Sequence, residues 1–114
     1  ADMFRFPQGI VIGDRKDDCD YGEAVLTVGL LDEDGYGGNC PSGDSSVTFG
    51  YENVASGNYA TVTGGAINHA SGWHSSVTGG WNNVASGIYS TVTGGRFNHA
   101  SGDESSVTGG YGNK

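Results

Sequence analysis

The chain of 114 residues is poor in charged side chains, and in positive ones above all. Five Lys and Arg residues stand against 13 Asp and Glu, which gives a formal net charge of −8. An acidic protein of this kind has no basic surface to hold a nucleic-acid backbone or an anionic membrane, so both are excluded as partners. Runs of about 18 apolar residues are also missing, and the sequence therefore predicts no membrane-spanning helix.

The motifs of common enzymes are missing too. The sequence has no Gly-x-Ser-x-Gly nucleophile elbow, no His-Glu-x-x-His zinc motif and no phosphate-binding P-loop. Ser, His and Asp occur at repeated positions, whereas a catalytic site is normally unique. A hydrolase or lyase built on a β-helix would need an acidic or basic cluster on its surface, and the repeats offer almost none. We therefore predict that the protein is not an enzyme.

Glycine, by contrast, is abundant and recurs with a fixed period. From Ser45 onward, a fifteen-residue unit returns in five copies, and its valine, asparagine and glycine positions return with it. A strict period of this length is the signature of an architecture in which successive units stack. The three series are Val47, Val62, Val77, Val92 and Val107; Asn53, Asn68, Asn83, Asn98 and Asn113; and Gly57, Gly72, Gly87 and Gly102.

Each unit is predicted to form one coil of a parallel β-solenoid. The Ser-Val-Thr segment favours a strand, and its alternation places Val inside and the two neighbours outside. Gly pairs and Ala-Ser-Gly triplets supply the turns, and glycine recurs too often for a helix. Residues 45–114 are therefore predicted to be a regular solenoid. We expect its thin interior of Val and Ala to be supplemented by an asparagine ladder at the turns.

Residues 1–44 are predicted to form degenerate coils with acidic loops. The segments Ile10–Gly13 and Leu26–Gly29 both match Val47–Gly50, with steps of sixteen and twenty-one positions. The extra residues of the second coil are placed in a loop at Asp32–Gly38. The whole chain is therefore expected to be an all-β solenoid of about seven coils.

The segments Ser76–Gly80 (Ser-Val-Thr-Gly-Gly) and Asn83–Gly87 (Asn-Val-Ala-Ser-Gly) show the repeat at its most regular. This pattern resembles the head repeats of trimeric autotransporter adhesins, the YadA-like β-roll family, over residues 45–114 clearly and 9–44 weakly. The resemblance implies a left-handed parallel β-roll, three chains side by side and binding to host or matrix surfaces. Similar repeats also decorate phage tail fibres and other surface filaments.

The two cysteines are predicted to form a disulfide. Cys19 precedes Leu26 by seven residues and Cys40 precedes Val47 by seven, so they occupy equivalent places on adjacent coils. Stacked coils lie about 5 Å apart, which suits a disulfide worth roughly 3 kcal/mol. Such a bond indicates an oxidising compartment, and we expect a secreted or cell-surface protein. Two free buried thiols are the alternative.

Ser and Thr on both sides of the repeated Val predict two columns of hydroxyls on one flat outer face. The columns should lie about 7 Å apart, with steps of about 4.8 Å along each. This arrangement is like the Thr-x-Thr face of insect antifreeze proteins, so ice binding is the alternative function. A simpler interpretation is that the hydroxyls are solvated or pack against partner chains. The predicted face consists of Ser46, Thr48, Thr61, Thr63, Ser76, Thr78, Thr91, Thr93, Ser106 and Thr108.

Aromatic residues at variable positions of the unit are predicted to project outward. Exposed aromatic side chains are candidate contacts for a glycan or a protein, or they pack between the chains of an oligomer. The candidate contact residues are Tyr51, Trp73, Trp81, Tyr89 and Phe97, with Tyr111 in the same set.

Histidines and acidic loops raise the question of a metal. His69 and His99 lie two coils apart, too far to share one ion, and a stacking or turn role is expected for them and for His74. Asp32 and Asp34 match a fragment of a calcium loop that lacks the further ligands of a complete site. A solvated acidic rim is the default interpretation, so we predict no cofactor, with calcium as the alternative.

These features together predict a non-enzymatic, extracellular structural or adhesive module. The rod is expected to associate with copies of itself, as a trimer or as an end-to-end fibre. The fibre is suggested because no obvious cap is present at Lys114, where exposed strand edges would template further stacking. The lateral surface would then bind a matrix component, a glycan or another surface ligand.

Overall fold

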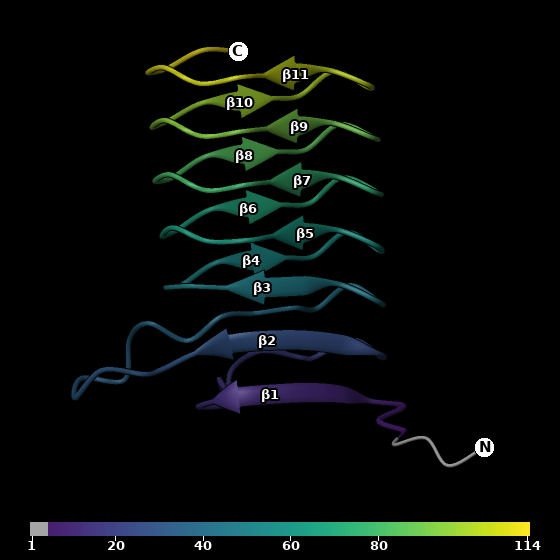
Figure 1. Ribbon diagram of the computed structural model, residues 1–114, viewed down its shortest axis with the longest axis vertical. Coiled ribbons are helices and arrows are strands. Elements are labelled where there is room, and N and C mark those ends of the chain that lie inside the picture. The colour runs from purple at the N-terminus through teal and green to yellow at the C-terminus, as the bar shows by residue number, and fades with distance from the viewer. Residues whose placement is uncertain (1–4) are drawn as a thin grey trace.

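A computed structural model describes residues 5–114; residues 1–4 of the N-terminal region 1–44 lie outside the described part. Between residues 5 and 114 the chain forms eleven short strands and no helix, so no helix there could cross a membrane. All strand pairs are parallel, and they form two layers stacked coil upon coil (Figure 1). The predicted all-β solenoid of about seven coils is confirmed.

The first sheet takes one strand from each coil, and the second sheet forms the return half of four coils. In Figure 1 the strands of the two layers run in opposite directions. The first sheet has the order β1-β2-β3-β5-β7-β9-β11, with β1 (Gly9–Gly13), β2 (Val25–Gly29), β3 (Val47–Phe49), β5 (Thr61–Val62), β7 (Ser76–Val77), β9 (Thr91–Val92) and β11 (Ser106–Val107). The second has the order β10-β8-β6-β4, with β4 (Val54–Ala55), β6 (His69–Ala70), β8 (Val84–Ala85) and β10 (His99–Ala100).

The stacking step equals the sequence period in the regular coils but is shorter between the third and fourth. Val62 pairs with Val77, fifteen positions on, as the period predicts. Thr48 pairs with Val62 and Val47 pairs with Thr61, which is a step of fourteen positions. The prediction of an unbroken step from Val47 onward is therefore wrong by one residue. Because side chains alternate across a strand, the shift turns Thr48 inward and Val47 outward.

The shift arises from one residue that the third coil lacks. In the third coil, Phe49 directly follows the inward residue Thr48, and its own carbonyl accepts the hydrogen bond from the Asn53 side chain. In the next coil, two residues follow the inward Val62 before the equivalent carbonyl: Thr63 and Gly64, whose carbonyl accepts the hydrogen bond from the Asn68 side chain. The regular coils thus contain an extra threonine that lies on the outer surface.

The interior is thin, as expected, and consists of small side chains. Val62, Val77 and Val92 form one completely buried column of the first sheet, so the predicted valine column is confirmed there. The second sheet faces it with one small residue per coil, and these are Ala55, Ala70, Ala85 and Ala100. So narrow an interior buries little apolar area for each residue, and backbone ladders must carry much of the stability.

A second inward column of the first sheet carries hydroxyls that have no hydrogen-bond partner. Four serines, Ser46, Ser75, Ser90 and Ser105, share this property. Ala60 occupies the same position in the fourth coil and is completely buried. The position therefore requires a small side chain rather than a polar one, and each unmade hydrogen bond costs about 1–3 kcal/mol.

We expect the double substitution Ser75→Ala and Ser90→Ala to stabilise the protein. Alanine already fits at Ala60, and the change removes two unpaired hydroxyls, so the free energy of unfolding should rise by about 2 kcal/mol or more. Urea unfolding followed by circular dichroism measures this. The control is Ser71→Ala with Ser101→Ala on the outer surface, which should change stability by less than about 0.5 kcal/mol. No gain for the buried pair would mean that these hydroxyls are satisfied in the folded protein.

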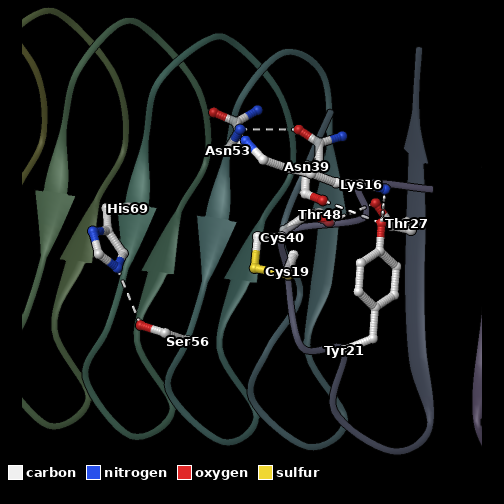
Figure 2. Close-up of a disulfide and its surroundings, with 10 residues drawn as sticks. All are labelled: Lys16, Cys19, Tyr21, Thr27, Asn39, Cys40, Thr48, Asn53, Ser56 and His69. Carbon is white, nitrogen blue, oxygen red and sulfur yellow. Dashed lines mark hydrogen bonds between the residues drawn. A yellow bond between two sulfur atoms is a disulfide. The ribbon is translucent and has the colours of Figure 1, made fainter. Parts of the chain in front are cut away.

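The predicted asparagine ladder is present, and it begins one coil earlier than the regular repeat. The amide of Asn83 shows the pattern, because its Nδ2 donates to the carbonyls of Gly79 (3.0 Å) and Gly95 (2.9 Å). Its Oδ1 accepts the backbone N–H of Asn98 at 2.9 Å. Figure 2 shows the first step of the ladder, from Asn39 to Asn53. The buried members are Asn39, Asn53, Asn68, Asn83 and Asn98.

Cys19 and Cys40 form the predicted disulfide, with their Cα atoms 5.7 Å apart (Figure 2). Leu26 pairs with Val47, which is the alignment of coils that the cysteine spacing predicts. The bond ties the first coil to the long second coil. It also indicates an oxidising environment for the folded chain.

Candidate functional site

The outer surface of the first sheet is a flat face of hydroxyl groups. In each of the four regular coils, the inward Val lies between a Thr or Ser and an exposed Thr. No charged side chain lies among these eight residues. This hydroxyl face consists of Thr61, Thr63, Ser76, Thr78, Thr91, Thr93, Ser106 and Thr108.

Two residues that were predicted for this face lie inside the solenoid instead. Ser46 and Thr48 are both completely buried, because the third coil is shifted by one residue. The Thr48 hydroxyl donates to that of Thr27 at 2.7 Å in the interior (Figure 2). The hydroxyl face therefore begins at the fourth coil, with Thr61.

The outer surface of the second sheet carries a half-buried column in which Val and His alternate. Each His ring lies next to a serine of the preceding coil. The Nε2 atom of His69 is 3.1 Å from Ser56 Oγ (Figure 2), and that of His99 is 2.9 Å from Ser86 Oγ. Burial lowers the pKa of His69, which keeps its ring neutral near pH 7. The column consists of Val54, His69, Val84 and His99.

One edge of the solenoid, formed by the turns from the second sheet back to the first, carries a column of stacked rings, and we call it the stacked edge. The ring centroids of Tyr59 and His74 are 4.7 Å apart, and those of His74 and Tyr89 are 5.2 Å apart, with interplanar angles of 18° and 14°. Trp73 packs across this stack at steep angles. The stacking covers both faces of the His74 ring and one face each of Tyr59 and Tyr89, which stay about half exposed. The stacked edge consists of Asn58, Tyr59, Trp73, His74, Ile88, Tyr89, Asp103 and Glu104.

The other edge, which we call the arginine edge, carries the remaining exposed aromatics of residues 51–111. The ring centroids of Trp81 and Phe97 are 4.9 Å apart, and those of Phe97 and Tyr111 are 5.6 Å apart. The Arg96 guanidinium lies 5.6 Å from the ring centroid of Tyr111. The arginine edge consists of Tyr51, Glu52, Ala66, Ile67, Trp81, Asn82, Arg96, Phe97 and Tyr111.

The predicted contact aromatics are therefore divided between two surfaces that face away from each other. Trp73 and Tyr89 lie on the stacked edge, in the turns between the second and first sheets. Tyr51, Trp81 and Phe97 lie on the arginine edge, in the turns between the first and second sheets. They cannot form one joint patch on a single chain.

Both edges hold bulky side chains on a left-handed backbone. A φ of +57° at Ile67 is an outlier for a β-branched residue, and each non-glycine residue in this region costs about 1–2 kcal/mol. Glycine would form the same turns at lower cost, so these side chains do not serve the turn itself. The edge residues with this backbone are Tyr59, His74, Tyr89 and Glu104 on the stacked edge, and Glu52, Ile67, Asn82 and Phe97 on the arginine edge.

The candidate calcium residues lie in the loop of the second coil, where Asp32 is engaged by the protein itself. Its Oδ1 accepts the backbone N–H groups of Asp34 and Tyr36 at 3.0 and 2.9 Å, and its Oδ2 accepts the Tyr51 hydroxyl at 3.2 Å. Partial desolvation and this hydrogen bond raise the pKa of Tyr51. Among residues 5–114, no three His, Cys, Asp or Glu side chains are grouped to hold a metal ion. Calcium at Asp32 and Asp34 stays the alternative to the prediction that the protein has no cofactor.

The fold and these surfaces define the class of protein: a β-solenoid repeat protein whose regular coils have a hydroxyl face, a face of alternating Val and His, and two aromatic edges. Comparisons with protein-family models, with curated proteins and with solved structures find no match for the chain. The resemblance to trimeric autotransporter heads accordingly rests on the repeat motif in the sequence.

Proposed function

We propose that the protein is a non-enzymatic structural or adhesive module that is secreted or held at a cell surface. In this proposal the rod associates with copies of itself and presents its lateral surface to a ligand. The observation that carries it is the exposure of apolar side chains along both edges. Nine large side chains between Tyr51 and Tyr111 are 38–69% exposed, and they line the two edges, where exposed apolar side chains in a row are typical of an interaction surface.

Two further features support self-association. The interior of each regular coil holds little more than one Val and one Ala, so burial between chains would supplement a thin core. The resemblance to trimeric autotransporter heads favours three chains side by side. The disulfide supports placement outside the cell.

We expect the purified chain to be oligomeric, because apolar edges of this extent gain stability when water is excluded from them. Size-exclusion chromatography with light scattering should give a mass that is a multiple of 11.7 kDa, and three times that value for a trimer. Larger end-to-end assemblies would be visible by electron microscopy. A single-chain mass at millimolar concentration would contradict the proposal.

The hydroxyl face favours ice binding as a second candidate. Its eight side chains form two regular columns without charge, repeating about every 4.8 Å along the rod. The Thr63 hydroxyl donates to the Thr78 carbonyl at 2.8 Å, which holds that side chain in one orientation.

If this face binds ice, the protein should show thermal hysteresis, and Thr78→Tyr with Thr93→Tyr should abolish most of it, because two tyrosines break the flat array. Substitution of Ser71 by Tyr on the opposite face is the control and should leave the hysteresis unchanged. An unmodified protein without hysteresis would exclude this function.

A further inference from the structure

The two aromatic edges share one axial period, because every regular coil contributes one turn to each edge (Figure 1). We call the two edge turns of one coil, taken together, a rung, and successive rungs repeat about every 4.8 Å along the rod. A surface that fits such an edge over several rungs must repeat at the same distance. Another copy of this solenoid, aligned in parallel, meets that requirement.

The residues at equal heights on the two edges are complementary. In the coil of residues 91–105, Arg96 lies on the arginine edge, and Asp103 and Glu104 lie on the stacked edge. In the coil of residues 61–75, Ala66 lies on the arginine edge and Trp73 on the stacked edge. When the arginine edge of one copy is placed beside the stacked edge of another, opposite charges meet on one rung. On another rung, the large side chain of Trp73 would pack against the small side chain of Ala66.

The neighbouring rungs of this arrangement are also compatible. Trp81 would lie opposite Ile88, so that two exposed apolar side chains, 38% and 43% exposed, cover each other. Glu52, the other charged residue of the arginine edge, would lie opposite Asn58 and Tyr59, both of which can donate hydrogen bonds. No rung of the regular coils brings two like charges together.

A contact between identical edges lacks this complementarity. If two copies met about a two-fold axis parallel to the rod, Arg96 would lie opposite Arg96. The stacked edges would likewise bring Asp103 and Glu104 against their own copies. Like charges placed opposite each other oppose such pairing, and they therefore favour a contact between unlike edges.

We infer that the arginine edge and the stacked edge are the two halves of one interface, through which parallel copies of this chain associate in register. This inference rests on the proposed self-association and assigns it a surface. An interface between unlike patches closes into a ring when a rotation axis relates the copies, and otherwise continues as an open array. A three-fold axis parallel to the rod would keep all rungs at equal height. The bulky side chains held on a left-handed backbone then serve the contact between chains.

Charge reversal tests the interface. We expect self-association to weaken by about tenfold or more in each of two variants, as it does when a complementary charge pair is removed. One variant carries Arg96→Glu, and the other carries Asp103→Lys with Glu104→Lys. A chain that carries all three substitutions should associate within about threefold of the unmodified chain, because complementarity is restored. Sedimentation velocity over a concentration series measures these constants. Circular dichroism confirms that each variant keeps its strands, which is expected because all three positions are exposed and Asp103→Lys removes only one side-chain hydrogen bond, from the Ile88 N–H.

Lys114→Glu is the matched control, because it changes the net charge by the same amount as Arg96→Glu. Lys114 lies one period after His99, and hence at a position of the second sheet's face rather than of an edge. It should leave association unchanged. If the unmodified chain associates but the reversals have no effect, or the triple variant is not rescued, the edge interface is overturned and self-association stands. An unmodified chain that stays monomeric overturns both.

Discussion

Replacing Gly72 by alanine is expected to destabilise the protein by about 3 kcal/mol or more, because rotamer changes cannot relieve a backbone overlap. Gly72 is buried in a column of glycines that stack coil upon coil. A Cβ atom at this position would overlap the carbonyl group of Gly87 in the next coil. The coils cannot separate locally, since the N–H groups of Ser71 and Gly72 both donate to the Ala85 carbonyl at 2.9 and 3.2 Å. Urea unfolding measures the loss.

Gly79→Ala is the matched control in the same chain. A Cβ atom at Gly79 would have no neighbour within 4 Å, and the backbone there is not left-handed. Alanine at such a position should leave the protein unchanged or stabilise it by about 0.4–1 kcal/mol, through the lower entropy of the unfolded chain. Equal losses for the two variants would show that glycine is required for chain flexibility rather than for the approach of the coils.

Much of the fold could be predicted because one geometric fact determines it. Residues fifteen positions apart stack, so the period alone places Val62 over Val77 and predicts the asparagine ladder. The disulfide could be predicted for the same reason, since Cys19 and Cys40 keep equal distances from the strands that follow them.

The orientation of the third coil could not be predicted from the valine period. Val47 belongs to the fifteen-residue valine series of the sequence, yet Thr48 is the residue that faces inward. The signal lay at the preceding turn, because Gly43 and Gly57 stack although they are only fourteen positions apart. Close packing at this turn sets the pairing of the strand that follows, and the missing residue is absorbed after Thr48. A turn that admits only glycine is thus a better guide to register than a valine that tolerates either face.

The division of the aromatics between two edges depends on backbone conformation that the repeat does not show. Tyr59 and His74 stack because both occupy the same left-handed position in successive turns. Propensity would place glycine or asparagine there. Alignment of the units predicts which residues are variable, but the direction of each side chain follows from this φ angle.

Substitution of Asn83 by alanine is expected to destabilise the protein by about 3–5 kcal/mol, since buried groups left without partners cost about 1–3 kcal/mol each. Asn83 is completely buried, and its side chain makes three hydrogen bonds to the backbone. Alanine would leave the Gly79 carbonyl and the Asn98 N–H without these partners. The Gly95 carbonyl still accepts the N–H of Trp81 at 3.0 Å and should lose less. Urea unfolding of the variant measures the change.

Asn113→Ala makes the same chemical change at a position where the asparagine side chain is exposed and makes fewer hydrogen bonds. Asn113 is exposed, and its amide donates one hydrogen bond, to the Gly109 carbonyl at 2.9 Å. We expect its loss to cost about 1 kcal/mol or less. Because each buried asparagine side chain binds both the turn of its own coil and the next coil, the loss at Asn83 should loosen the contact between these two adjoining coils. Hydrogen exchange should therefore quicken in the two adjoining coils, whereas a loss confined to one turn would show that valine packing, not the ladder, joins the coils.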